Sequence, residues 1–231
     1  MAKRNKLQKF AELASIPFVF QCFSYDDKKL YNHLNEVVEL SGTWGKTVFN
    51  NDKPIVLELA CGRGEYSVAL ADAYPDKNFI GVDIKGARFW RGAKTALEEN
   101  MTNVAFLRSQ IELTDLLFAE NEVSEIWITF PDPQIKYTRT KHRMTNKEFL
   151  KKYHTVLNEN GVVNLKTDSE FMHGYTLGLL HGEGHEIIYA HHDVYGNPHA
   201  PKEVTSTQTF YESGYLEKGK PITYIKFKIR Y

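Results

Sequence analysis

The sequence has few cysteines, the residues that form disulfide bonds and many metal sites. Its 231 residues include only two cysteines, Cys22 and Cys61, and these stand in no disulfide-framework or metal-ligand spacing. A disulfide scaffold and a cysteine-based metal centre are therefore excluded, and we expect a protein of the reducing cytoplasm. Six histidines between His173 and His199 follow no ligand spacing either, so we predict no metal.

The chain also lacks net charge and long apolar runs. Its 29 basic and 29 acidic residues cancel, so a polyanionic partner must be met by a local basic patch and not by a global field. No apolar run approaches the length of a membrane span, and the basic N-terminus is not followed by the apolar segment of a signal peptide. We therefore expect no membrane partner. Composition is that of an ordinary globular protein, with 42% hydrophobic residues and no repeat or low-complexity tract.

The most informative segment runs from Pro54 to Asp83. Residues 55–59 form a short apolar run that predicts a buried strand, and Gly62 and Gly64 then allow a tight turn. Residues 65–74 have helical periodicity, and residues 79–83 form a second apolar run that ends in a carboxylate. Strand, glycine turn, helix and acid-terminated strand are the first half of a nucleotide-binding α/β sheet.

The charges around the glycine turn indicate which nucleotide fits. A dinucleotide places its pyrophosphate on the helix N-terminus, and the third glycine of the usual fingerprint is Ser67 here. Glu58 and Glu65 also crowd the turn, and anions are unfavourable beside a diphosphate. An adenosine with a cationic centre fits better, so we predict S-adenosylmethionine, with Asp83 on the ribose hydroxyls and Glu58 facing the methionine end. The structural alternative is that these acids are solvated or cap a helix.

Two further strand ends carry polar residues. A helix over 86–100 and a strand over 104–107 lead to Gln110, which could bond the adenine amino group or face water. A fourth strand over 125–130 leads to Pro131-Asp132-Pro133, where two prolines fix the backbone and leave the acid exposed. A structural turn would explain this tripeptide in isolation. Its place at the carboxyl edge of the sheet, where ligands bind, favours a functional role for Asp132.

A cationic segment follows, with no acid before Glu148. It includes Lys136, Arg139, Lys141, Arg143 and Lys147. Such a segment can neutralise RNA phosphates, although a solvated loop is the alternative. Beyond it, Thr145 and Glu148 have the spacing of a capping box. We expect a helix from there to 157, a strand over 162–167, a helix over 171–180 and a last strand over 222–229.

Five motifs together resemble the bacterial tRNA (guanine-N7)-methyltransferases: LELACGRG, GVDI, FPDP with its basic loop, LKTD and a late T-x-Y-E. The similarity extends from about residue 42 to the end. It implies a Rossmann-like class I methyltransferase, an α/β fold with a seven-stranded, mostly parallel sheet, helices on both faces and one antiparallel strand. It also implies a methyltransferase domain over 42–231, S-adenosylmethionine as methyl donor and a guanosine in the tRNA variable loop as acceptor. Residues 1–41 are then an N-terminal lead-in that begins with the basic residues Lys3, Arg4, Lys6 and Lys9. A solvated, frayed terminus is the favoured interpretation of these residues, and a basic arm along RNA phosphates is the alternative.

The resemblance also implies roles for individual residues. The cofactor contacts are Glu58, Gly62, Gly64, Asp83, Gln110 and Asp132. Asp132 is the catalytic acid. The substrate contacts are Lys136, Arg139, Lys141, Arg143, Asp168, Thr209, Tyr211 and Glu212. The chain departs from the family pattern at Gln110, where an aspartate is usual, and at Gln134-Ile135, where Trp-Pro is usual. Tyr137 and Thr138 also stand at positions that are normally basic.

The resemblance implies an in-line methyl transfer to guanine N7. This nitrogen is an unprotonated lone pair, so the site must supply alignment and stabilise positive charge rather than remove a proton. Asp132 can do both by binding the guanine edge. The alternatives are a methyltransferase on another RNA or a small molecule, a nicotinamide-dependent oxidoreductase, and a non-catalytic RNA-binding module. We expect a monomer or a homodimer.

Overall fold

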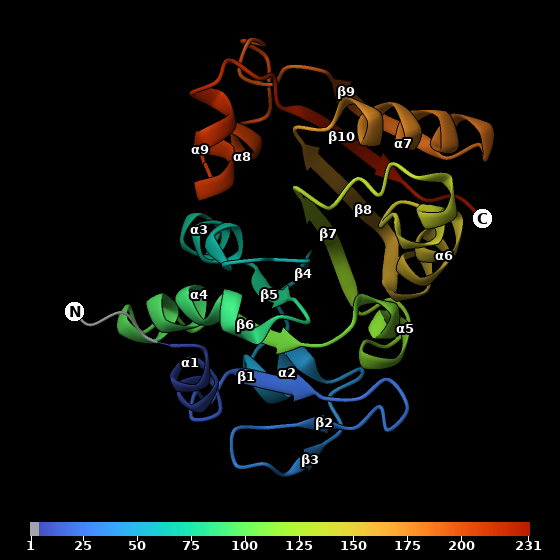
Figure 1. Ribbon diagram of the computed structural model, residues 1–231. Coiled ribbons are helices and arrows are strands. Elements are labelled where there is room, and N and C mark those ends of the chain that lie inside the picture. The colour runs from blue at the N-terminus through green and yellow to red at the C-terminus, as the bar shows by residue number, and fades with distance from the viewer. Residues whose placement is uncertain (1–4) are drawn as a thin grey trace. The chain divides into compact units, whose positions relative to one another are not determined.

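The computed structural model describes residues 5–231, so Lys3 and Arg4 of the predicted basic arm lie outside the described residues. The chain forms two compact units, residues 1–119 and residues 120–231 (Figure 1). Each unit has its own group of strands and its own helices. Within residues 5–231, no helix is long and apolar enough to cross a membrane.

The first unit is built on a sheet whose core is parallel. Its strand order is β3 (Val37–Val38), β2 (Leu30–Tyr31), β1 (Val19–Cys22), β6 (Val104–Arg108), β5 (Asn78–Val82) and β4 (Ile55–Leu59). The last four strands of this order are parallel, and β2 pairs antiparallel with both β1 and β3. Every residue of β4 and β5 is buried. Such continuous burial is typical of parallel strands that are covered on both faces.

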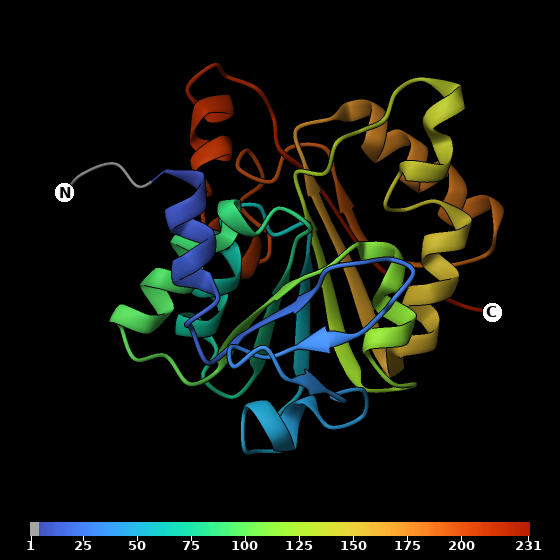
Figure 2. The same cartoon turned by 60° about the horizontal axis from the view of Figure 1, so that its bottom comes forward.

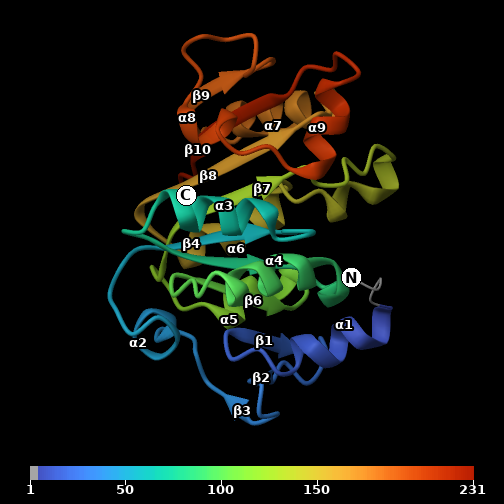
Figure 3. The same ribbon diagram turned by 90° about the vertical axis from the view of Figure 1, so that its left-hand side faces the viewer.

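Helices of the first unit cover this core. They are α1 (Lys6–Leu13), α2 (Trp44–Val48), α3 (Glu65–Ala73), α4 (Gly86–Glu98), the 3-10 turn η1 (Ile111–Leu113) and α5 (Thr114–Leu117). Both α3 and α4 contact β6, and Phe89 of α4 stacks on Phe106 with ring centroids 5.5 Å apart. Figure 3 shows α1 beside α4. The indole Nε1 of Trp90 donates to Glu12 Oε2 over 2.8 Å, which fixes α1 there.

The second unit, which runs from yellow-green to red in Figure 2, contains four strands. Its strand order is β7 (Val123–Thr129), β8 (Leu157–Thr167), β10 (Thr223–Lys228) and β9 (Glu186–His191). The pair β7–β8 is parallel, whereas β10 pairs antiparallel with β8 and with β9. The helices are η2 (Tyr137–His142), α6 (Lys147–Val156), α7 (Glu170–Gly182), α8 (Lys202–Thr205) and α9 (Phe210–Leu216).

A polar cluster lies among the strands of the second unit. The hydroxyl of Tyr224 donates to Asn164 Oδ1 over 2.7 Å, and Asn164 Nδ2 donates to Glu125 Oε1 over 2.9 Å. The ring of Trp127 stacks on Tyr224 at 6.0 Å. Asn164 is fully buried, and these partners satisfy both ends of its amide.

The α/β class and the mostly parallel core are as predicted, but the strand count is wrong. The described residues form six strands in the first unit and four in the second, where seven were predicted, and four strand pairs are antiparallel. The strands that were not predicted are β2, β3 and β9. β2 and β3 have two residues each, and β9 is mostly exposed because it lies at a sheet edge in this unit.

The start of α6 also differs from the prediction. The N-cap is Asn146, whose Oδ1 accepts from the Phe149 N–H over 3.0 Å. Thr145 was predicted to cap with Glu148, but its hydroxyl is buried and shares a 2.7 Å hydrogen bond with the Thr176 hydroxyl of α7. Asparagine and threonine both cap helices well. Because the Thr145 hydroxyl is hydrogen-bonded to α7, the N-cap of α6 is the next residue, Asn146.

Candidate functional site

The glycine turn after β4 has the tight geometry that its two glycines predict. The φ angles of Ala60, Gly62 and Gly64 are 59°, 57° and 72°, in the left-handed region. The Gly64 N–H donates to the Cys61 carbonyl over 2.8 Å. A Cβ on Gly64 would stand 2.6 Å from Phe106 Cε1. The second glycine is therefore needed for its conformation and for space.

Asp83 joins the end of β5 to this turn. Its Oδ2 accepts from the Gly62 N–H over 3.0 Å, and its Oδ1 accepts from the Lys85 N–H over 2.7 Å. The side chain is buried at 7% exposure. A carboxylate has about four acceptor positions. Asp83 can therefore hold the turn and still accept from two hydroxyls of a ligand.

Glu58 lies inside β4 and faces the first turn of α3. Its Oε2 accepts from the backbone N–H of Ser67 over 2.8 Å and from the Ser67 hydroxyl over 2.5 Å. Ser67 is the third residue of α3, so this oxygen has the capping role that was the structural alternative. A carboxylate there also occupies the place where a helix N-terminus would bind a phosphate. The pairing with Glu58 explains the serine that replaces the usual glycine, a connection that the sequence reasoning missed.

A pocket opens beside Asp83. Its volume is about 230 Å³, and its lining is Ala60, Asp83, Ile84, Ser109, Gln110, Ile111 and Glu112. The structure thus brings together Asp83 and Gln110, and the Gly62 N–H is held by the same carboxylate. Glu58 does not line this pocket. A carboxylate for hydroxyls, an amide for a purine edge and two isoleucines for its ring faces fit an adenosine.

Cys61 lies in the same turn but does not act as a nucleophile. Burial, with the negative charges of Glu58 and Asp83, raises the pKa of its thiol well above the usual value. The thiol is therefore neutral, and only a thiolate is strongly nucleophilic.

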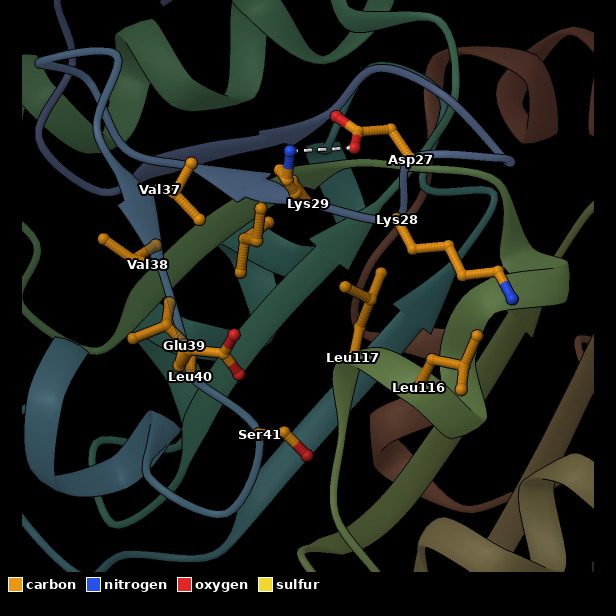
Figure 4. A pocket seen from close by; sticks show the side chains of 11 residues that line it. Asp27, Lys28, Lys29, Val37, Val38, Glu39, Leu40, Ser41, Leu116 and Leu117 are labelled. Carbon is orange, nitrogen blue, oxygen red and sulfur yellow. Dashed lines mark ion pairs between the residues drawn. The ribbon is translucent and has the colours of Figure 1, made fainter.

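A second pocket of the first unit is shown in Figure 4. Its volume is about 210 Å³, and Val37 and Val38 of β3 lie across it from Leu116 and Leu117 of α5. The ammonium of Lys29 pairs with Asp27 at 3.1 Å on its rim. None of the predicted site residues lines it, so it is not the predicted cofactor pocket.

In the second unit, Asp132 stands on a shaped loop after β7. Phe130 and Gln134 have φ angles of 49° and 48°, an uncommon region for residues other than glycine. The Phe130 N–H donates to the Lys166 carbonyl over 2.8 Å, and the Gln134 N–H donates to Asp132 Oδ1 over 3.2 Å. The Asp132 side chain is exposed. The loop therefore presents a fixed carboxylate to solvent.

The basic segment divides into exposed cations and one buried cation. Lys136, Arg139 and Lys141 are exposed, whereas Arg143 is 6% exposed. The guanidinium of Arg143 donates over 3.1 Å to the carbonyls of Gln134 and Ile135, and it stacks over the ring of Tyr175 at 4.4 Å. Arg143 therefore holds the segment in shape. Lys147 is exposed as well, but its ammonium pairs with Glu183 at 2.6 Å. Lys136, Arg139 and Lys141 are therefore the cations most accessible to phosphates.

The late T-x-Y-E motif forms the start of α9. Thr209 Oγ1 accepts from the Glu212 N–H and Glu212 Oε2 accepts from the Thr209 N–H, both over 3.2 Å. This is a capping box, which the sequence reasoning did not recognise. Both side chains are buried, whereas Tyr211 is 55% exposed.

Asp168 lies just beyond β8 and interacts with α9. Its negative charge, together with burial and a hydrogen bond to the Tyr215 hydroxyl, raises the pKa of Tyr215. The predicted substrate residues Asp168 and Tyr211 therefore belong to the same end of this unit. Figure 1 and Figure 3 show that β8 points toward α9.

Sequence reasoning also missed the partner of Glu212. Its carboxylate pairs with the ammonium of Lys166 at 2.6 Å, and both side chains are fully buried. Burial lowers the pKa of Lys166. The motifs LKTD and T-x-Y-E each contain one member of the pair, but nothing in their spacing indicates that the two meet.

The histidine-rich stretch does not converge on a centre. No group of three or more histidine, cysteine, aspartate or glutamate side chains that could hold a metal ion lies within residues 5–231.

Comparison with known proteins assigns the chain to a family. Residues 52–225 match the family model described as "Putative methyltransferase". A tRNA (guanine-N(7)-)-methyltransferase of Christiangramia forsetii is 64% identical over 230 residues, covering 100% of both chains. One from Bacteroides fragilis is 46% identical and covers 97% of this chain and 85% of its own. The solved 16S rRNA methyltransferase KamB has a similar fold, with a TM-score of 0.63, 14% identity and coverage of 85% of this chain and 97% of its own. On its sequence and its fold, the chain belongs to the tRNA (guanine-N(7)-)-methyltransferase family of Rossmann-like class I methyltransferases.

Proposed function

We propose that this protein transfers a methyl group from S-adenosylmethionine to N7 of a guanosine in the variable loop of tRNA, forming 7-methylguanosine. The observation that carries the proposal is the pocket beside Asp83, in which an acid tied to the glycine turn meets Gln110. The name of the relative from C. forsetii states the same reaction on tRNA guanine. The alternative is methyl transfer to another RNA or to a small molecule.

The cofactor is held by residues of the first unit. Asp83 accepts from the ribose hydroxyls, Gln110 bonds the adenine edge, and the backbone at Gly62 and Gly64 leaves room for close approach of the ligand. Glu58 places a negative charge near the turn, where it stabilises a cationic ligand. S-adenosylmethionine supplies an electrophilic methyl group on a sulfonium when it is bound.

The acceptor is held by residues of the second unit. Guanine N7 needs no base because its lone pair is already free. Asp132 aligns the guanine by accepting from its Watson–Crick edge, and its charge offsets the positive charge that develops on the purine. Asp168 and Tyr211 hold the same base, and Lys136 contacts a phosphate. The target base must be unstacked to reach these groups.

One observation weighs against a nicotinamide-dependent oxidoreductase. Glu58 already caps the first turn of α3 through Ser67, so a pyrophosphate there would lie beside a buried carboxylate. A non-catalytic RNA-binding module would need neither this pocket nor an exposed Asp132.

The direct test is methyl transfer from labelled S-adenosylmethionine to unmodified tRNA, followed by nucleoside analysis of the digest. We expect the label in 7-methylguanosine. Cofactor binding without label in tRNA would favour the alternative acceptors, and label in another nucleoside would overturn the assignment of N7.

The remaining features are also proposals. We propose that residues 42–231 form the methyltransferase domain, with 1–41 as a lead-in, and that the protein works in the cytoplasm as a monomer or a homodimer. The lead-in supplies α1, β1, β2 and β3 to the first unit.

Replacing Asp83 with alanine should raise the Kd for S-adenosylmethionine by about 10- to 100-fold, since a hydrogen bond to a charged group is worth about 1.5–3 kcal/mol. Two ribose contacts and the anchor of the Gly62 N–H are lost together. Calorimetric titration of S-adenosylmethionine measures the change. Asp72→Ala, in the exposed part of α3, is the matched control, and an unchanged Kd in Asp83→Ala would contradict the ribose role.

Lys141→Ala and Arg143→Ala should behave differently although each removes one cation. Lys141 is exposed, so its loss should lower the salt slope of tRNA binding by about one and leave stability unchanged. Arg143 is buried against two carbonyls and a ring, so its loss should destabilise the fold by about 2–3 kcal/mol. Binding titrations at several salt concentrations and urea unfolding separate the two. Equal salt slopes and equal stabilities for both variants would show that the division is wrong.

A further inference from the structure

The T-x-Y-E motif contains a charged side chain that solvent does not reach. Glu212 is fully buried, and its two oxygens accept hydrogen bonds from within the protein. Oε1 accepts from the Tyr195 hydroxyl over 2.8 Å and pairs with Lys166 at 2.6 Å, and Oε2 accepts from the Thr209 N–H over 3.2 Å. A base could bind this carboxylate only after part of the network had been broken.

The ammonium of Lys166 is likewise hydrogen-bonded to groups of the protein. A lysine ammonium has three donors. They meet Glu212, the Val204 carbonyl at 2.5 Å and the Thr207 carbonyl at 3.2 Å. The ammonium therefore binds the end of α8, the connection between α8 and α9, and the first turn of α9. One side chain of β8 fixes a segment that is about forty residues further along the chain.

The backbone of Lys166 is hydrogen-bonded to the start of the loop that carries Asp132. Its carbonyl accepts from the Phe130 N–H, two residues before Asp132. Asp168, two residues after Lys166, is near enough to Tyr215 of α9 for its negative charge to raise the pKa of that phenol. Within the second unit, Lys166 is thus the point where the Asp132 loop, Asp168 and α9 are joined.

A buried ion pair is weak grounds for a role in stability, because desolvation of two charges offsets their attraction. The pair instead fixes the position of the segments that it joins. In the observed arrangement of residues 202–216, the ammonium meets Glu212 and two backbone carbonyls, and both oxygens of Glu212 have partners within the protein.

We propose that Lys166 is a positioning residue for the methyl acceptor. It acts through Glu212 and the Val204 and Thr207 carbonyls to hold α9, so that Tyr211 and Asp168 present one rigid face to the guanine. The inference rests on the proposed function and deepens it, because it gives Glu212 a role in shaping the acceptor site without touching the base.

The test compares Lys166→Met with Asn164→Leu. Asn164 lies on the same strand, is equally buried and belongs to a separate polar cluster with Tyr224 and Glu125. Both substitutions remove a satisfied buried polar side chain. Only the first releases residues 202–216.

For Lys166→Met we expect kcat/KM for tRNA to fall about 100-fold, the scale of a displacement of about 1 Å in a site. The Kd for S-adenosylmethionine should stay within about twofold, because the cofactor residues of the pocket lie in the first unit. Amide hydrogen exchange should accelerate across residues 205–216. In Asn164→Leu, kcat/KM should stay within about threefold and exchange in that segment should be unchanged, even if Tm falls.

Equal losses of kcat/KM in the two variants, or unchanged exchange in Lys166→Met, would overturn the proposal. If Lys166→Met fails to fold, Tyr195→Phe removes a single hydrogen bond to Glu212 and should still lower kcat/KM about threefold to tenfold, and no loss would count against the proposal. Failure of the proposed function gives a different result. The wild-type protein would then make no 7-methylguanosine, whereas hydrogen exchange would still report whether Lys166 holds residues 205–216.

Discussion

Asp132→Ala is expected to lower kcat for methylation of tRNA by about 10²–10³-fold, the effect of removing one preorganised electrostatic group from an active site. The purine becomes cationic as N7 is alkylated, and Asp132 is the exposed carboxylate that the Pro-Asp-Pro loop fixes at the end of β7. Single-turnover kinetics with saturating tRNA measure the loss. The Kd for S-adenosylmethionine should change much less than kcat.

Two variants sharpen this result. Asp132→Asn keeps the shape and the hydrogen bond from Gln134 but removes the charge, so its kcat should fall between those of the wild type and the alanine variant. Glu159→Ala removes an exposed acid near the start of β8 and should leave kcat unchanged. Equal losses of kcat and of cofactor affinity in Asp132→Ala would mean that this acid serves the cofactor and not the acceptor.

The parts of the fold that could be predicted are those with continuous apolar patterns. β4, β5 and β6 are short apolar runs, and each lies where the sequence indicates. They lead into the glycine turn, Asp83 and the polar pair Ser109-Gln110, respectively. β2 and β3 could not be predicted because two residues carry no periodicity. β9 was missed because an edge strand with exposed side chains has no buried face to impose alternation.

Two copies of one pattern had opposite outcomes. Thr145-x-x-Glu148 has the capping-box spacing but forms no box, since the Thr145 hydroxyl bonds Thr176. Thr209-x-x-Glu212 was interpreted only as a contact with a base, which stays a prediction, and the structure shows that it forms the box. The local pattern is the same in both places, and tertiary partners on other elements decide which side chains are available for capping. Those partners are remote in sequence and cannot be read from the motif.

The sequence did not predict which of the site residues are buried. Arg143 and Lys141 are two residues apart in one basic segment. Arg143 is buried and bonded to backbone carbonyls of the segment, whereas Lys141 is exposed. The ligand contacts of Glu58 and Glu212 stay predictions, and the structure adds that both side chains are buried with protein partners on their oxygens. Charge type and position in a motif predict where a site lies. They do not distinguish a residue that touches the ligand from one that shapes its neighbours.

Gly64→Ala should destabilise the protein by about 4 kcal/mol, because a left-handed φ costs a non-glycine residue about 1–3 kcal/mol and overpacking adds about 1–3 kcal/mol. The added methyl would stand 2.6 Å from Phe106 Cε1 and 3.3 Å from the Gly92 Cα. Phe106 is fully buried and stacked on Phe89, so it has no space into which to move. Urea unfolding gives the change in the free energy of unfolding.

Gly62→Ala separates the two contributions. Gly62 has a similar φ of 57°, but the nearest atom to an added Cβ is the Ala60 carbonyl oxygen at 3.9 Å. Its substitution should therefore cost only the conformational part, about 1–2 kcal/mol. Equal destabilisation of the two variants would mean that backbone conformation alone selects both glycines. A larger loss at Gly64 would mean that this glycine is also needed for the close packing of the turn against α4 and β6, which holds the turn in place beside Asp83.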